Sequence, residues 1–125
     1  MKTLFLLIFL GLGGNIFVPA HAKSKPRGGQ NYYVDAQNGD DRADGKSEKT
    51  AWKSLLRTKE LQLRAGDSLL LRRNSSFNGL LEVSAEGKAG RPAVIGAYGT
   101  GRKPCIQAPD SSLYTVLVRN SDYLT

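Results

Sequence analysis

The stretch RAGDSLLLR, residues 64–72, marks the point at which the sequence changes character. A Gly-Asp turn signal leads directly into a short apolar run, and such runs, separated by turn residues, continue to the end of the chain. Runs of this kind predict strands at 68–72, 80–83, 93–95, 105–107 and 115–118. Their centres lie roughly a dozen residues apart, which fits a β-sandwich or a parallel β-helix equally well.

The residues before this point predict one more strand, a loop and a short helix. Residues 31–35 (NYYVD) are aromatic and β-branched, so they predict a strand, and residues 36–47, rich in Asn, Asp and Gly, predict a loop. Residues 51–63 carry apolar side chains at helical spacing with basic residues between them, which predicts an amphipathic helix. The apolar positions are Trp52, Leu55 and Leu56, and the candidate helix caps are Thr50 and Ser47.

The N-terminal residues 1–22 have the three parts of a secretory signal peptide. A basic start at Lys2 is followed by an apolar run and by the small residues Ala20 and Ala22, so cleavage is expected after Ala22. The alternative is a transmembrane anchor, which needs about 20 consecutive apolar residues, but glycines and Pro19 interrupt the run too early. The sequence therefore predicts a secreted or periplasmic protein that has no membrane segment after signal cleavage.

The predicted mature chain divides into a leader and one domain. Residues 23–30 contain no large apolar side chain and predict a flexible leader, whereas residues 31–125 predict one small folded domain. Cys105 is the only cysteine, so no intramolecular disulfide is available, and we interpret it as a small buried hydrophobe. The lone histidine, His21, lies in the signal peptide, which excludes a Cys/His catalytic pair from the mature chain.

The net charge of +7 raises the question of an anionic partner. The basic residues are scattered rather than clustered, so nucleic acid is a poor candidate, and an acidic polysaccharide or a cell-surface glycan fits an exported protein better. A solvated basic surface without a specific partner is an equal alternative.

Four segments carry a resemblance to a known superfamily: YYVD with its acidic, glycine-bearing loop (32–47), TAWKSL (50–55), RAGDSLLL (64–71) and the Gly/Pro turns of 87–104. In this order they resemble the N-terminal region of secreted right-handed parallel β-helix proteins, the pectate lyase-like superfamily of polysaccharide lyases and glycoside hydrolases. The resemblance implies an all-β fold, a right-handed parallel β-helix whose N-terminal end is capped by the short helix. Trp52 and Leu55 would face its first rung.

The predicted β-helix is short. Residues 68–125 accommodate about two coils, whereas solenoids usually need three or more repeats. We therefore expect the chain to be a gene fragment whose last residues enter a further strand.

The resemblance places catalytic groups on later coils. Lyases of this group abstract a proton with Lys or Arg, often with Ca²⁺, and hydrolases use paired carboxylates. The sequence therefore predicts neither a catalytic residue nor a bound cofactor, and between the two reactions we favour a lyase.

Three groups of residues are candidate binding sites with a simpler alternative each. Ca²⁺ is a candidate ligand of the acidic loop, but Arg42 and Ala51 break an EF-hand register, so we favour turn formers and helix-dipole partners. Arg72 and Arg73 would suit an anionic sugar, although a solvated strand end is favoured. The residues of the acidic loop are Asp35, Asn38, Asp40, Asp41 and Asp44. The third group consists of five tyrosines whose rings could stack on sugars, although we favour packing against other side chains. They are Tyr32, Tyr33, Tyr98, Tyr114 and Tyr123.

Three functional hypotheses follow. The first is the N-terminal fragment of an exported β-helix protein related to polysaccharide-degrading enzymes and not catalytic alone. The second is a non-catalytic exported module of the same fold that binds carbohydrate or serves as a surface scaffold, and the third is a small β-sandwich with an unrelated binding role. Residues 74–76 (NSS) also match a glycosylation acceptor, which acts only in a eukaryotic secretory pathway.

Overall fold

The computed structural model describes residues 28–125. The predicted signal peptide, residues 1–22, and residues 23–27 of the predicted leader lie outside the described residues. The described chain consists of strands and one short 3-10 helix, so the all-β class is confirmed. The elements are β1 (Asn31–Val34), η3 (Leu55–Glu60), β2 (Gln62–Leu63), β3 (Ser68–Arg72), β4 (Ser76–Asn78), β5 (Leu81–Glu86), β6 (Val94–Tyr98), β7 (Cys105–Gln107) and β8 (Val116–Asp122).

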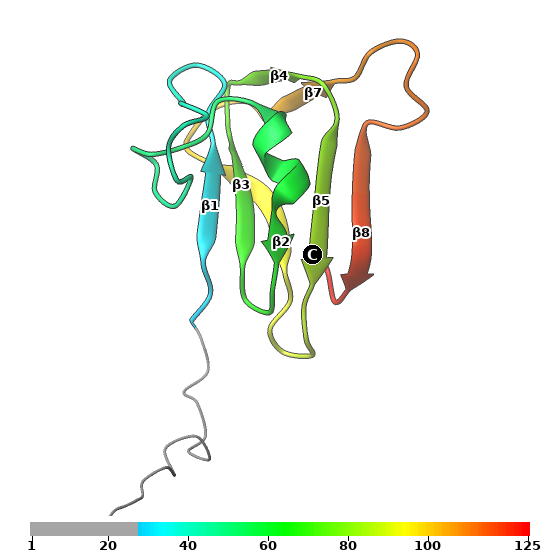
Figure 1. Ribbon diagram of the computed structural model, residues 1–125. Coiled ribbons are helices and arrows are strands. Elements are labelled where there is room, and N and C mark those ends of the chain that lie inside the picture. The colour runs from blue at the N-terminus through cyan, green and yellow to red at the C-terminus, as the bar shows by residue number, and fades with distance from the viewer. Residues whose placement is uncertain (1–27) are drawn as a thin grey trace, which may run out of the picture.

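The strands form parallel sheets of order β1-β3-β6, β2-β5-β8 and β4-β7 (Figure 1). The chain passes through the three sheets in the order β3, β4, β5 and then repeats that order with β6, β7, β8. Each strand of the second set therefore pairs with its counterpart in the first, as Ser68 with Val94 shows. Such parallel pairing requires a long crossover between partners, so the antiparallel β-sandwich is wrong.

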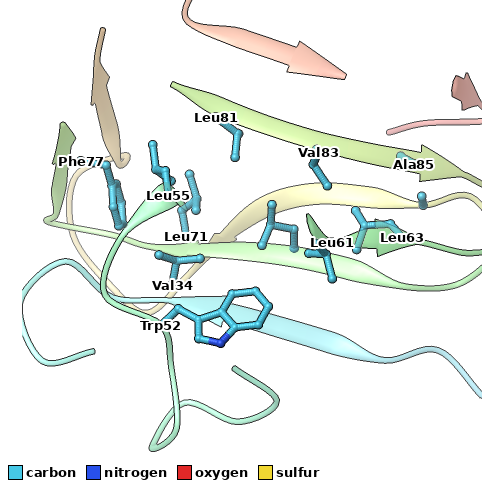
Figure 2. Packing of buried hydrophobic residues seen from close by; sticks show 12 residues of the cluster. Val34, Trp52, Leu55, Leu61, Leu63, Leu71, Phe77, Leu81, Val83 and Ala85 are labelled. Carbon is cyan, nitrogen blue, oxygen red and sulfur yellow. The ribbon is translucent and has the colours of Figure 1, made fainter. Parts of the chain in front are cut away.

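The core lies between the sheets and is filled by alternate residues of the strands. In β3 the inward side chains are Leu69 and Leu71, and in β5 they are Leu81, Val83 and Ala85, all less than 5% exposed. Figure 2 shows side chains from β1, β3 and β5 converging in this interior. Full burial of each leucine contributes about 1.5–3 kcal/mol, so the alternation supplies much of the driving force for this packing.

The Gly-Asp turn that opens β3 also fixes the start of the fold. Asp67 is 1% exposed; its Oδ1 accepts from the backbone N–H of Gln30 at 2.9 Å and its Oδ2 from that of Arg64 at 2.9 Å. One carboxylate thus joins the residue before β1 to the turn before β3. Gln30, placed in the predicted leader, is already held by the folded chain.

The predicted helix over residues 51–63 is wrong in length and in its start. The structure has only the 3-10 helix η3, and Ser54, not Thr50 or Ser47, is its N-cap, accepting from Leu56 N at 3.3 Å. The cause is tertiary, because Trp52 pairs with β1 in extended conformation: its N–H donates to Tyr33 O and its carbonyl accepts from Asp35 N. The far end, Gln62–Leu63, is drawn into the sheet beside β5.

The inward facing predicted for Trp52 and Leu55 is confirmed. Trp52 and Leu55 are buried in the core, whereas Leu56 is 72% exposed. Figure 2 shows Trp52 beside Val34 of β1. A 3-10 helix turns more tightly than an α-helix, so its shorter inward face holds fewer positions.

The predicted strands are present, with shifted bounds, and two short ones were missed. β5, β6 and β8 all run further toward the C-terminus than predicted. β2 and β4 have two and three residues, too few for an alternation pattern, although Phe77 of β4 is buried. Cys105, predicted to be buried, is exposed because alternation in β7 turns Ile106 inward instead.

Gly45 provides a test of how the loop packs on Trp52. Its φ is +73°, and an added Cβ would meet the Trp52 indole ring, whereas Gly90 has a similar φ of +76° with open space around it. We expect Gly45→Ala to lower the free energy of unfolding by about 1–2 kcal/mol more than Gly90→Ala, because only the first adds overpacking to backbone strain. Urea denaturation followed by circular dichroism measures both, and equal losses would contradict the described packing.

Candidate functional site

A polar hollow of about 500 Å³ lies where β1, β3 and β6 end. Parallel strands bring their carboxyl ends to one edge of a sheet, so residues far apart in sequence meet there. Asp35 follows the last residue of β1, Arg72 ends β3 and Tyr98 ends β6, and Arg72 and Tyr98 are register partners. The hollow is lined by Asp35, Gln37, Glu48, Arg72, Arg73, Asn74, Tyr98, Gly99 and Thr100.

The central interaction of this hollow is an ion pair between Asp35 and Arg72. Arg72 Nη1 donates to Asp35 Oδ2 at 2.8 Å, while the backbone N–H groups of Gln37 and Asn38 donate to Asp35 Oδ1 at 2.9 and 3.1 Å. Burial by itself raises the pKa of Asp35, but these hydrogen bonds and the charge of Arg72 outweigh it and hold the pKa below its ordinary value. Asp35 is therefore a fixed anion and is unsuited to the role of a proton-carrying general acid.

Tyr98, a partly exposed side chain whose hydroxyl oxygen is buried, also lines this hollow. Its ring packs edge-on against Tyr33 with 5.1 Å between ring centroids, and its hydroxyl oxygen, with less than 1 Å² exposed, has no hydrogen-bond partner among the described residues. Burial, followed by the negative charge of Asp35, raises the pKa of Tyr98 to about 12. The side chain therefore stays a neutral phenol that can both donate and accept.

The other charged groups around the hollow balance one another. Glu48 and Asp35 bring two negative charges, and Arg72 and Arg73 bring two positive ones. Arg73 Nη1 donates to Gly101 O at 3.3 Å, which is a long bond for an exposed guanidinium. The lining therefore offers donors and acceptors without a large excess of either charge.

The carboxylates of the loop predicted as a Ca²⁺ candidate are all hydrogen-bonded within the fold, and those of Asp40 and Asp44 bond near neighbours. Asp40 bonds Arg42 at 3.0 Å, and Asp44 accepts from the backbone of Lys46 at 2.9 Å. Among residues 28–125, no group of three or more His, Cys, Asp or Glu side chains is placed to hold a metal ion.

Asp41 is the helix partner that the sequence predicted for this loop. Its Oδ1 accepts from the N–H groups of Lys53 and Ser54 at 2.8 Å each, and its Oδ2 accepts from Ser54 Oγ at 2.7 Å. Burial raises the pKa of Asp41, but these hydrogen bonds outweigh it and lower the pKa overall. The interpretation as turn formers and helix partners is therefore confirmed for Asp35 and Asp41.

The structure also tests the arginine and tyrosine predictions. Arg72 ends β3 with a side chain that is 39% exposed, as expected of a solvated strand end, but it also has a partner that the sequence did not predict: Asp35, 37 residues away in sequence. Packing is confirmed for Tyr32, which stacks on Trp52 with 5.8 Å between centroids, and for the pair of Tyr33 and Tyr98. Tyr114 and Tyr123 are instead 40% and 62% exposed.

Sequence reasoning missed Gln37, Glu48 and Thr100 of the lining, and it named Asp35, Arg72 and Tyr98 separately but did not bring them together. A signal existed, since each stands directly after an apolar inward residue at a strand's carboxyl end: Val34, Leu71 and Ala97. Their alignment depended on a parallel register that the sequence did not specify.

In the part of the chain that the structure describes, no helix has the length and apolar character needed to cross a bilayer.

Comparison with known proteins finds similarity to one kind of glycan-active enzyme. It is 41% identical over 75 residues to the lacto-N-biosidase of Bifidobacterium longum subsp. longum, a match covering 57% of this chain and 5% of that protein. No family model matches the sequence.

Solved structures give the same result. The GH136 lacto-N-biosidase from Eubacterium ramulus matches in its selenomethionine form with a TM-score of 0.67 and 33% identity, over 76% of this chain and 19% of that one. Its native form matches with a TM-score of 0.56 and 43% identity, over 59% and 12%. The chain thus spans less than a fifth of these proteins. They are glycoside hydrolases, not pectate lyase-like proteins.

The ion pair of Asp35 gives a stability prediction with a defined pH dependence. We expect Asp35→Asn to lower the free energy of unfolding at pH 7 by about 2 kcal/mol, because three donors, two of them backbone N–H groups, lose a buried ionised acceptor. Since the folded pKa lies below the ordinary 3.8, this contribution exists above that value and disappears as the pH falls through the lowered one. Urea denaturation from pH 7 to pH 2 measures it.

Asp40→Asn is the matched control, because Asp40 pairs with an arginine, Arg42, whose side chain is 91% exposed. Exposed pairs contribute little, so this variant should match the wild type at pH 7. Similar losses of unfolding free energy in both variants would show that the Asp35 ion pair stabilises the fold no more than an exposed pair does.

Proposed function

We propose that this chain is the N-terminal region of an exported right-handed parallel β-helix protein of the glycan-degrading kind, closer to glycoside hydrolases than to lyases. In this proposal the described residues form the helix-capped end and the first coils. They contribute to glycan binding and to the stability of the end, and they do not cleave glycosidic bonds on their own.

The observation that carries the proposal is agreement between sequence and structure in one group of enzymes. A TM-score of 0.67 accompanies 33% identity, which is well above what a shared fold alone requires. Repeated passage of the chain through three parallel sheets in one order supports a β-helix. The short helix η3, packed against β5 at the start of the array, supports the role of a cap.

The non-catalytic role rests on the carboxylates of the hollow. Glycoside hydrolases need one carboxylic acid that keeps its proton near neutral pH and a second carboxylate that acts as base or nucleophile. Asp35 is held as an anion by three hydrogen bonds and cannot supply the proton. The proton donor of such a pair would therefore have to be Glu48, the other carboxylate of the lining, or a residue from elsewhere in a glycan hydrolase of this kind.

The alternative is a non-catalytic exported module that binds carbohydrate or acts as a surface scaffold. The charge-balanced hollow at the ends of β1, β3 and β6 favours the carbohydrate-binding version, because it offers donors and acceptors rather than a set of catalytic acids. The enzyme-fragment proposal and the carbohydrate-binding version of the alternative both require this chain to bind a glycan.

The proposal predicts glycan binding without chemistry. The full chain should bind at least one member of a panel of neutral and acidic oligosaccharides in titration calorimetry, and should release neither new reducing ends nor the ultraviolet-absorbing unsaturated product that a lyase forms. Unsaturated product from a polyuronate would instead establish a lyase, and failure to bind every glycan would contradict both versions.

Export is proposed from residues 1–22 and gives a separate prediction. Expressed in a bacterium with a secretory pathway, the protein should leave the cytoplasm with Lys23 as its new N-terminus, because small residues at Ala20 and Ala22 suit signal peptidase. Replacing Ala22 with a bulky residue (Ala22→Leu) should leave the precursor uncleaved. N-terminal sequencing of the exported protein checks this, and an intact Met1 on the wild type would contradict it.

A further inference from the structure

We propose that the two turns leading into β4 and β7 form a binding site for a tetrahedral oxyanion, the sulfate or phosphate ester of a glycan. The site is a hollow of about 230 Å³, which we call the basic hollow, lined by Asn74, Ser75, Ser76, Arg102, Lys103 and Cys105. Its anion chemistry stands on these described residues, whereas the choice of a glycan as the carrier of the anion rests on the proposed function.

The first argument is the charge of the lining. Arg102 and Lys103 bring two positive charges to the basic hollow, and none of its six lining residues is acidic. The hollow at the ends of β1, β3 and β6 has two carboxylate side chains in its lining, and so has a hollow at the ends of β2, β5 and β8. The excess of positive charge is therefore a local property of the basic hollow and does not simply repeat the net charge of the chain.

The second argument is that these cations are free to bind a ligand. Among residues 28–125, neither the Arg102 nor the Lys103 side chain forms an ion pair, and both residues are exposed. Arg73 adds a third positive charge nearby, because its Nη1 donates to Gly101 O, next to Arg102, at 3.3 Å. Positive charges that stand close together repel one another, so an anion bound between them is attracted by all three.

The third argument is that the fold holds the two turns in a fixed relation. Asn74, with a φ of +60°, accepts from the Arg102 N–H through its Oδ1 at 2.8 Å, and its own N–H donates to Arg102 O at 2.9 Å. The Cys105 N–H donates to Ser75 O at 3.0 Å, where β4 and β7 begin to pair (Figure 1). The backbone of Arg102 is thus fixed before a ligand arrives, which reduces the entropy lost on binding.

The fourth argument is the chemistry of the groups that a ligand can reach. Asn74 uses its side-chain oxygen on Arg102, so its NH₂ group remains a donor, and Ser76, an exposed residue, adds a hydroxyl. Ser75 Oγ, with less than 1 Å² exposed, is out of reach. A sulfate or phosphate ester offers three terminal oxygens in a tetrahedral arrangement, whereas a carboxylate offers two in one plane. The ester therefore accepts from more of these amide, hydroxyl, guanidinium and ammonium donors.

The test uses the full chain and Cys105, its only cysteine, which is exposed in the lining. A ligand in the basic hollow covers this thiol, so it should slow alkylation by neutral iodoacetamide, measured by mass spectrometry. The ligands share one sugar ring: glucose, glucuronate, glucose 6-sulfate and glucose 6-phosphate. An ester at about ten times its Kd should slow alkylation about tenfold, because most sites are then occupied. Glucuronate should protect less, and glucose no more than sodium chloride at the ionic strength of the esters.

Charge-removing variants test the two cations. Arg102→Gln and Lys103→Gln should each weaken the Kd of the esters about fivefold, the effect of losing one exposed charge pair. The urea midpoint should stay that of the wild type, because neither side chain has an ion-pair partner among residues 28–125. Lys88→Gln is the matched control, since it removes the same charge from an exposed lysine that lines a different hollow, and it should leave the Kd unchanged.

The outcomes separate this site from the proposed function. Tighter binding of one ester than of the other supports the site and identifies its group. Protection by the esters that glucose, glucuronate or sodium chloride equals overturns the site, and so does equal weakening by Lys88→Gln and Lys103→Gln. If the esters protect Cys105 while no oligosaccharide of the panel binds, the anion site stands and the proposed function fails. If the panel binds and the esters do not protect, the reverse holds.

Discussion

The parallel register of β1, β3 and β6 is the constraint on which the rest of the structure depends. It sets Val34, Leu71 and Ala97 in one inward row and Asp35, Arg72 and Tyr98 in the next, outward row. A slip of one residue in any of the three strands would exchange the two faces, bury charged groups and expose the apolar ones. The core and the polar hollow are therefore two consequences of the same alignment.

Carboxylates maintain that alignment at both ends of the strands. Asp67 binds backbone N–H groups of Gln30 and Arg64 before β1 and β3 begin, and Asp35 binds those of Gln37 and Asn38 after β1 ends. Asp41 does the same for the segment that leads into η3. With no disulfide available, these hydrogen bonds fix turns that would otherwise leave backbone donors unsatisfied, so the acidic loop is part of the scaffold.

The hollow draws its properties from this structural use of charge. Because Asp35 is occupied by Arg72 and by backbone donors, its negative charge is already compensated, and the lining adds a second arginine, Arg73, and a glutamate, Glu48. The similarity to lacto-N-biosidases covers less than a fifth of their length.

The sequence by itself determined the all-β class, most of the strands from β1 onward, the inward facing of Trp52 and Leu55, and the turn-forming role of Asp40 and Asp44, because alternation and turn chemistry act between near neighbours. It did not determine the length of η3, the exposure of Cys105 or the partner of Arg72. Trp52 is held extended by hydrogen bonds to β1, alternation in β7 is set by its pairing with β4, and Asp35 reaches Arg72 only through the β1–β3 register. Those outcomes belong to the tertiary structure, since each depends on a contact between residues that the chain brings together only when its parallel strands align.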